Sequence, residues 1–155
     1  MLKYADTAVV FEEVPNKVTL AIDISGCPCR CPLCHSKHLW GDIGSELTEE
    51  ALEGLLEAKK GINCVAFMGG DNDPAAINAL AAYVKNHHDG IAVAWYSGRE
   101  AISTSITLGN FDYIKIGPYI EEAGPLNSET TNQRFFEVVD GCLNDVTDKF
   151  WKLRE

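Results

Sequence analysis

Four of the six cysteines of this 155-residue chain lie within eight positions, at Cys27, Cys29, Cys31 and Cys34. Pro28 and Pro32 lie among them, and proline fixes φ and lacks a backbone N–H, so this segment can form neither a regular helix nor a central strand. Thiolates on short, turn-rich loops are typical ligands of iron-sulfur clusters. The spacing Cys27-x3-Cys31-x2-Cys34 therefore predicts a loop that wraps a metal centre, with Cys29 as an additional thiol.

Three thiolate ligands on a cuboidal cluster leave one iron without a protein ligand, and that iron can bind a substrate. The cysteines could instead form disulfides, bind zinc or be free structural thiols. Disulfides would need an oxidising compartment, whereas the first residues lack the apolar core of a signal peptide, so a cytoplasmic protein is expected. Zinc bound by these cysteines with His35 or His38 would usually need a second ligand pair about 12 to 20 residues further on, and none is present. Free structural thiols are usually isolated in a core rather than clustered beside prolines.

The composition is that of an ordinary globular protein. A chain of 17.0 kDa suits a single domain covering residues 1–155, and 46% hydrophobic with 23% charged residues is typical of soluble proteins. No apolar run approaches 18 residues, so no membrane span is expected. The net charge of -10, without a Lys/Arg cluster, argues against a nucleic-acid partner.

Two strands are predicted before the cysteines, over residues 8–13 and 17–24, with a turn at Pro15-Asn16. In the second segment apolar residues alternate with Thr19, Ala21 and Asp23, which is the period of a strand with one strongly buried face. This strand leads directly into the cysteine loop. The loop is therefore expected at the carboxyl end of a strand, where open α/β folds bind their ligands.

After the cysteines, helical and strand patterns alternate. Thr48 and Asp73 are expected to cap two helices, and a weaker helical pattern follows Gly98. The expected elements are helices over 49–60, 74–88 and 99–108 and strands over 64–68, 91–96 and 113–116. Such an alternation predicts an α/β fold with a mostly parallel sheet and right-handed crossovers.

The last third of the chain has a different pattern. Residues 119–134 are polar and are expected to form a loop, and Asp140-Gly141 predicts a short C-terminal hairpin between strands 135–139 and 142–146. A short helix is expected over 148–155. A closed eightfold barrel typically needs about 250 residues. At 155 residues, an open, partial (β/α) barrel is expected instead.

A glycine turn, Gly69-Gly70-Asp71, follows the predicted strand 64–68. Paired glycines let a ligand approach the backbone closely, and the carboxylate of Asp71 can hold an ammonium group. A plain tight turn with an aspartate cap would give the same pattern. In a parallel sheet, however, this turn and the cysteine loop lie at the same edge, which favours a shared site.

A three-cysteine motif after a first strand and a glycine turn with an acidic residue after the next are the two leading motifs of one enzyme superfamily. The sequence resembles the radical S-adenosylmethionine enzymes and, within them, the anaerobic ribonucleoside-triphosphate reductase activating proteins. The narrower resemblance rests on motifs spread over residues 25–134: Ser25-Gly26-Cys27, Cys31-Pro32-Leu33-Cys34-His35, Trp40, Gly69-Gly70-Asp71, Trp95-Tyr96-Ser97-Gly98, Gly117-Pro118-Tyr119-Ile120-Glu121-Glu122 and Thr131-Asn132-Gln133-Arg134.

The resemblance implies an oxidoreductase with a radical SAM fold and a 4Fe-4S cluster held by Cys27, Cys31 and Cys34. One electron passed through the cluster would cleave S-adenosylmethionine to methionine and a 5'-deoxyadenosyl radical. That radical would take hydrogen from a glycine of the large subunit of the reductase, leaving a glycyl radical. No general acid or base is required, so no catalytic side chain is assigned. The resemblance further implies a low-potential electron donor such as reduced flavodoxin and a possible homodimer.

The same resemblance assigns contacts to S-adenosylmethionine. Gly69, Gly70 and Asp71 would bind its methionyl amino group, and Tyr96, Ser97 and Gly98 would approach its ribose or carboxylate. Leu33 stands where the superfamily often has an aromatic residue near the adenine. Trp95 and Tyr96 are equally well explained as core aromatics. Two further functions stay open: a small radical SAM enzyme acting on a small molecule, and a non-catalytic iron-sulfur or zinc module.

Overall fold

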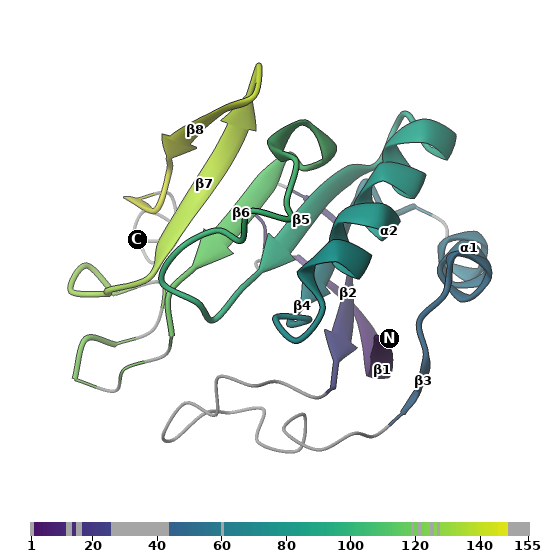
Figure 1. Cartoon of the computed structure of the whole chain (residues 1–155), viewed down its shortest axis with the longest axis horizontal. Helices are drawn as coiled ribbons and strands as arrows, with labels where there is room; N and C mark the ends of the chain where they lie inside the picture. Colours follow the sequence, from purple (N-terminus) through teal and green to yellow (C-terminus); the bar gives the residue numbers. More distant parts are fainter. Residues whose placement is uncertain are drawn as a thin grey trace.

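The computed structural model describes residues 2–11, 14, 17–25, 44–59, 61–118, 120, 122–124, 126 and 128–148. These residues form one mixed sheet of eight strands with two α-helices (Figure 1). The strands are β1 (Lys3–Val10), β2 (Thr19–Ile24), β3 (Ser45–Glu46), β4 (Cys64–Met68), β5 (Ala92–Tyr96), β6 (Tyr113–Ile116), β7 (Arg134–Val139) and β8 (Cys142–Asp145). The helices are α1 (Glu49–Ala58) and α2 (Pro74–His87).

The strand order in the sheet is β3-β1-β2-β4-β5-β6-β7-β8. The four central strands, β2, β4, β5 and β6, run parallel to one another, while the strands on both flanks pair antiparallel. The α/β class is therefore confirmed, with the parallel part confined to the centre of the sheet. The carboxyl ends of the parallel strands share one edge, and the predicted ligand residues follow these ends.

Both helices begin where the sequence predicts, because each has a side-chain cap. Thr48 Oγ1 accepts a hydrogen bond from Ala51 N at 3.1 Å, and Asp73 Oδ1 accepts one from Ala76 N at 3.2 Å. Each cap satisfies a backbone N–H that has no partner within its helix. None of the helices that the structure describes has both the length and the apolar composition needed to cross a bilayer.

The two faces of the sheet differ in what covers them. Alternate strand residues point to opposite faces, and the large apolar ones pack against α1 and α2. In Figure 1, α2 lies across this face of the sheet. The buried residues of this cluster include Leu20, Ile22, Ile24, Leu52, Leu56, Val65, Phe67, Ile77, Leu80, Val84, Val93, Trp95 and Ile114.

The other face carries small side chains at its centre. Ala21, Ala66 and Ala94 are opposite one another on adjacent parallel strands. A second, smaller buried cluster lies on this side and includes Ala66, Ala94 and Phe135. Neither described helix contributes to that cluster. The sheet is thus covered by helices on one face, with small residues along the middle of the other.

The predicted helix over residues 99–108 is wrong. This segment forms bends and turns and ends in a short 3₁₀ turn at Leu108–Asn110. Side chains bind its backbone amides: Ser103 Oγ accepts from Ser105 N at 3.1 Å, and Asn78 Oδ1 accepts from Thr107 N at 2.9 Å. Such bonds compete with the helical pattern, which explains the failure of the prediction.

Other boundaries differ in smaller ways. The first strand begins at Lys3 and ends at Val10, not at 8–13, because residues 4–10 pair antiparallel with β2. β3 was not predicted, and β7 begins at Arg134, within the predicted loop. The C-terminal hairpin is confirmed, with positive φ at Asp140 (53°) and Gly141 (75°) in its turn. Of the helix predicted over residues 148–155, only Asp148 is among the described residues.

Candidate functional site

The candidate site is the edge of the sheet where the parallel strands end. The last described residue after β2, Ser25, is buried, and its N and Oγ both donate to Lys3 O, at 3.0 and 3.3 Å. The cysteine loop begins at the next position. Its predicted ligands Cys27, Cys31 and Cys34, the extra thiol of Cys29, and Leu33 all lie within residues 26–43, outside the described part of the chain.

The glycine turn after β4 packs between β2 and α2. Gly69 and Gly70 both have positive φ, 111° and 91°, which side-chain-bearing residues rarely adopt. A Cβ atom on Gly69 would lie 3.1 Å from the carbonyl oxygen of Ile24, and one on Gly70 would lie 2.6 Å from Cδ1 of Ile77. The positive φ angles and the close packing together favour glycine at both positions. They bring the turn against the residue that precedes Ser25 and the cysteine loop.

The carboxylate of Asp71 joins the end of β4 to the end of β5. Asp71 is only 6% exposed; its Oδ1 accepts from Ser97 Oγ at 2.5 Å and its Oδ2 from Gly98 N at 2.9 Å. Ser97 Oγ in turn accepts from Arg99 N at 3.1 Å. Three predicted site residues, Asp71, Ser97 and Gly98, are thus brought into direct contact.

The aromatic residues at this edge support the glycine turn. Trp95 is buried, and its indole Nε1 donates to Gly69 O at 2.7 Å. The carbonyl of Tyr96 accepts from Gly69 N at 3.0 Å. The ring of Tyr96 packs edge-on against Phe135, with centroids 5.9 Å apart, on the face that carries the small residues. Tyr96 therefore contributes its backbone to the turn and its ring to the smaller core cluster.

Lys115 is a residue of this edge that the sequence motifs did not indicate. Its Nζ donates to the carbonyls of Ser97 at 3.2 Å and Gly117 at 2.8 Å, and its own carbonyl accepts from Ser97 N at 2.8 Å. A lysine within the apolar strand Tyr113–Ile116 was the available signal, because charged residues seldom enter buried strands without partners. The ends of β4, β5 and β6 are thus connected through Ser97.

The two cysteines that the structure describes lie away from this edge. Cys64 is buried at the start of β4, and burial raises the pKa of its thiol to about 11. A cysteine in a strand is usually buried, but Cys142 is exposed, because it lies on the edge strand β8, whose four residues are all exposed. Within the described ranges, no group of three or more His, Cys, Asp or Glu residues is arranged to hold a metal ion.

No family model, curated protein or solved structure matches this chain. Its function is therefore inferred from the sequence motifs and from the geometry of the strand ends.

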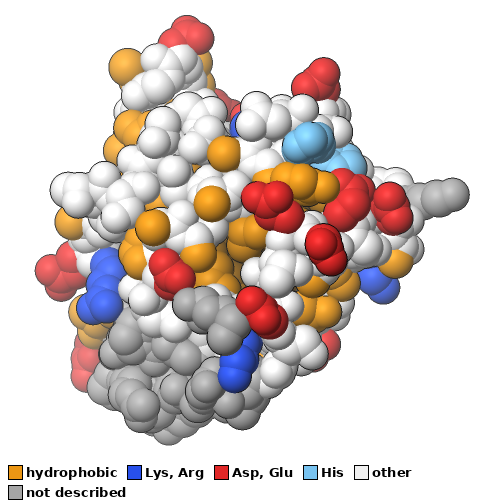
Figure 2. All heavy atoms as spheres, turned by 45° about the vertical axis from the view of Figure 1, so that its right-hand side comes forward, with side chains coloured by type: hydrophobic (Ala, Val, Ile, Leu, Met, Phe, Trp, Pro, Cys, Tyr) orange, Lys and Arg blue, Asp and Glu red, His pale blue; other side chains and the backbone are white. Residues whose placement is uncertain are grey.

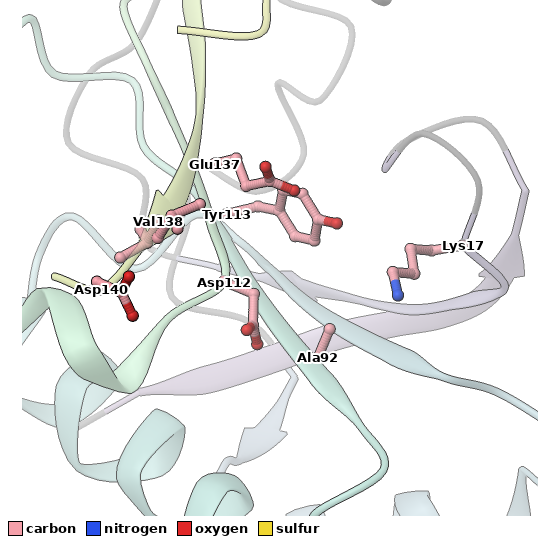
Figure 3. Close-up of a pocket in the computed structure, with 8 residues that line it drawn as sticks. Lys17, Ala92, Asp112, Tyr113, Glu137, Val138 and Asp140 are labelled. Carbon is pink, nitrogen blue, oxygen red and sulfur yellow. The ribbon is translucent and has the colours of Figure 1, made fainter. Parts of the chain in front are cut away.

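A cavity of about 360 Å³ lies at the opposite edge of the sheet (Figure 3). It is lined by the residues that begin β5 and β6, by the end of β7, and by neighbouring residues just before β2 and β6 and just after β7: Lys17, Ala92, Asp112, Tyr113, Glu137, Val138, Val139 and Asp140. Burial, and secondarily the carboxylate of Glu137, raise the pKa of Tyr113 to about 12. Asp112 already forms an ion pair with Lys85 and accepts from Val93 N at 2.8 Å. The predicted ligand residues that the structure describes are not among the residues that line this cavity.

Proposed function

We propose that this protein is a radical SAM activating enzyme that generates a glycyl radical on anaerobic ribonucleoside-triphosphate reductase. The observation that carries the proposal is the contact between the end of β2 and the glycine turn. The carbonyl of Ile24, three residues before Cys27, lies 3.1 Å from the Cβ position of Gly69. This contact holds the described end of β2, the strand that leads into the cysteine motif in the sequence, beside the turn. Crevices at such strand ends are where open α/β sheets bind ligands.

The polar groups at this edge suit a ligand with an amino-acid moiety. The glycine turn and Asp71 lie on one side of Ser97, and the ammonium group of Lys115 lies on the other. A ligand carboxylate would find a group of opposite charge in Lys115, and the methionyl amino group would lie beside the glycine turn. When bound and reduced, a 4Fe-4S cluster on Cys27, Cys31 and Cys34 would supply the electron that cleaves the sulfonium C–S bond of S-adenosylmethionine.

The shape of the sheet also supports a radical SAM type of partial barrel. Both described helices cover one face, and the centre of the other carries Ala21, Ala66 and Ala94. Small side chains on an inner face leave room for a ligand that extends from the carboxyl edge across the sheet. In this proposal, S-adenosylmethionine lies along that face.

The end of the polar loop 119–134 packs at the same edge of the sheet. Thr131 and Gln133 are buried, and a Cβ atom on Gly117 would lie 3.1 Å from Cα of Gln133. The loop therefore returns against the end of β6. We propose that the glycine-bearing segment of the reductase approaches here, and that a low-potential carrier such as reduced flavodoxin supplies the electron.

The proposal is tested by electron paramagnetic resonance. The protein is loaded anaerobically with iron and sulfide, reduced, and mixed with the reductase and S-adenosylmethionine. A glycyl radical signal is expected with the wild type and with Cys142→Ala, which removes the exposed thiol, but not with Cys34→Ala. Cleavage of S-adenosylmethionine without any radical on the reductase would instead favour a radical SAM enzyme that acts on a small molecule.

A further inference from the structure

We infer that Asp71 is a positioning residue that fixes the Ser97–Gly98 segment beside the glycine turn, and that it acts by accepting hydrogen bonds and not by its charge. The sequence motif alone assigns this carboxylate to the ammonium group of the ligand. The inference rests on the proposed function where it concerns S-adenosylmethionine. The role of Asp71 in the ligand-free protein can be measured independently.

Both carboxylate oxygens of Asp71 already have hydrogen-bond donors. They accept from the end of β5, at 2.5 Å from Ser97 Oγ and 2.9 Å from Gly98 N, and the residue is 6% exposed. Hydrogen bonds to a carboxylate are among the stronger ones in proteins, and leaving a buried donor without its acceptor is costly. The carboxylate therefore already links the ends of β4 and β5 by hydrogen bonds.

The linked segment is held from its other side as well. Ser97 N donates to Lys115 O at 2.8 Å, and Ser97 O accepts from Lys115 Nζ at 3.2 Å. Every polar group of Ser97 is thus engaged, and the serine is only 1% exposed. Such a segment is fixed before any ligand arrives, which reduces the ordering cost of binding. Removing Asp71 would release one side of this support.

The chemistry of asparagine separates the two possible roles of Asp71. In Asp71→Asn, the amide oxygen can still accept from Gly98 N, and the amide nitrogen can donate to Ser97 Oγ, since a hydroxyl oxygen has two acceptor lone pairs. Asp71→Asn therefore retains both links without the negative charge. Asp71→Ala loses both. A residue that bound the ligand by its charge would be disabled by either substitution.

The first measurement is amide hydrogen exchange by nuclear magnetic resonance on the ligand-free protein. Gly98 N–H is expected to stay protected in Asp71→Asn and to exchange at least about tenfold faster in Asp71→Ala. Asp73→Ala is the matched control, because Asp73 caps α2 two positions further on and its loss should affect Ala76 but not Gly98. Unchanged protection of Gly98 in Asp71→Ala, or lost protection in Asp71→Asn, would overturn the inference. If Asp71→Ala does not fold, Ser97→Ala, which removes one of the two links, replaces it, with a smaller loss of protection expected at Gly98.

The second measurement is the Kd for S-adenosylmethionine, determined by anaerobic equilibrium dialysis on the cluster-loaded protein. Asp71→Asn is expected to bind within about threefold of the wild type and Asp71→Ala at least about tenfold more weakly. If Asp71→Asn binds as weakly as Asp71→Ala while Gly98 stays protected, the charge itself binds the ligand and the inference is wrong. If the wild type does not bind S-adenosylmethionine, the proposed function fails, and the exchange rates still decide the positioning role.

Discussion

At Gly70, both the backbone conformation and the packing of neighbouring atoms oppose a side chain. Its φ of 91° is unfavourable for alanine, and a Cβ atom would lie 2.6 Å from Cδ1 of Ile77. Gly70→Ala should therefore lower the free energy of unfolding by about 1 to 3 kcal/mol in urea denaturation. Gly54→Ala, at an open position in α1, is the control and should raise it by about 0.5 to 1 kcal/mol. Equal effects of the two substitutions would contradict this account of the turn.

The hydrogen-bond partners of Asp71 could not be predicted from the sequence, although the turn that contains it could. The motif Gly69-Gly70-Asp71 identifies a turn after a buried strand, and that much is local. The partners of Asp71 depend on the pairing of β4 with β5, which sets Met68 opposite Tyr96 and so aligns the two strand ends. No pattern within either strand encodes that register. Lys115 was missed for the same reason, since its acceptors belong to Ser97 and Gly117.

At the scale of elements, α1 is tied to α2 by one acidic side chain. Glu53 Oε1 accepts from Tyr83 OH at 2.7 Å and lies 2.8 Å from His88 Nε2. The rings of Tyr83 and His87 also contact each other, with centroids 4.4 Å apart. The described histidines form the pale blue patch in Figure 2, next to hydrophobic and acidic side chains. This polar link supplements the apolar packing of Leu52 and Leu56.

The link predicts a pH-dependent contribution to stability. The hydrogen bond from Tyr83, and next that from His88, hold the pKa of Glu53 below its ordinary value of 4.5. A lowered pKa in the folded state stabilises the protein above the ordinary value, and this contribution is lost as the pH falls through the lowered one. Glu53→Gln should therefore lower the urea midpoint at pH 6, and its difference from the wild type should shrink below pH 4.5. Glu57→Gln removes a carboxylate one turn further along α1 that makes neither of these two hydrogen bonds, and is the matched control. A difference between Glu53→Gln and the wild type that grows on acidification would contradict the prediction.

The elements that could be predicted are those with local signals. Thr48 and Asp73 fixed the starts of α1 and α2, and the short apolar runs fixed β4 and β6. The segment 99–108 could not be predicted, because Asn78, a residue of α2, binds the amide of Thr107. The bounds of β1 were wrong because pairing with β2, and not its own pattern, determines them.

At the scale of the whole molecule, the sheet separates two kinds of packing. Large apolar side chains and both described helices stabilise one face, while alanines and the ring of Phe135 lie on the other. The parallel strands end at one edge, with the cysteine loop expected after β2 and the Asp71–Ser97 link between β4 and β5. We therefore assign stability mainly to the helix-covered face, and we propose that the chemistry takes place at the carboxyl edge.

The most direct test of the proposed function is anaerobic cleavage of S-adenosylmethionine. The protein is loaded with iron and sulfide, reduced and incubated with S-adenosylmethionine, and 5'-deoxyadenosine is quantified by chromatography. Product is expected from the wild type and from the control Cys142→Ala, and none from Cys31→Ala. No product from a wild-type protein with a complete 4Fe-4S cluster, or equal product from Cys31→Ala, would contradict the proposed function.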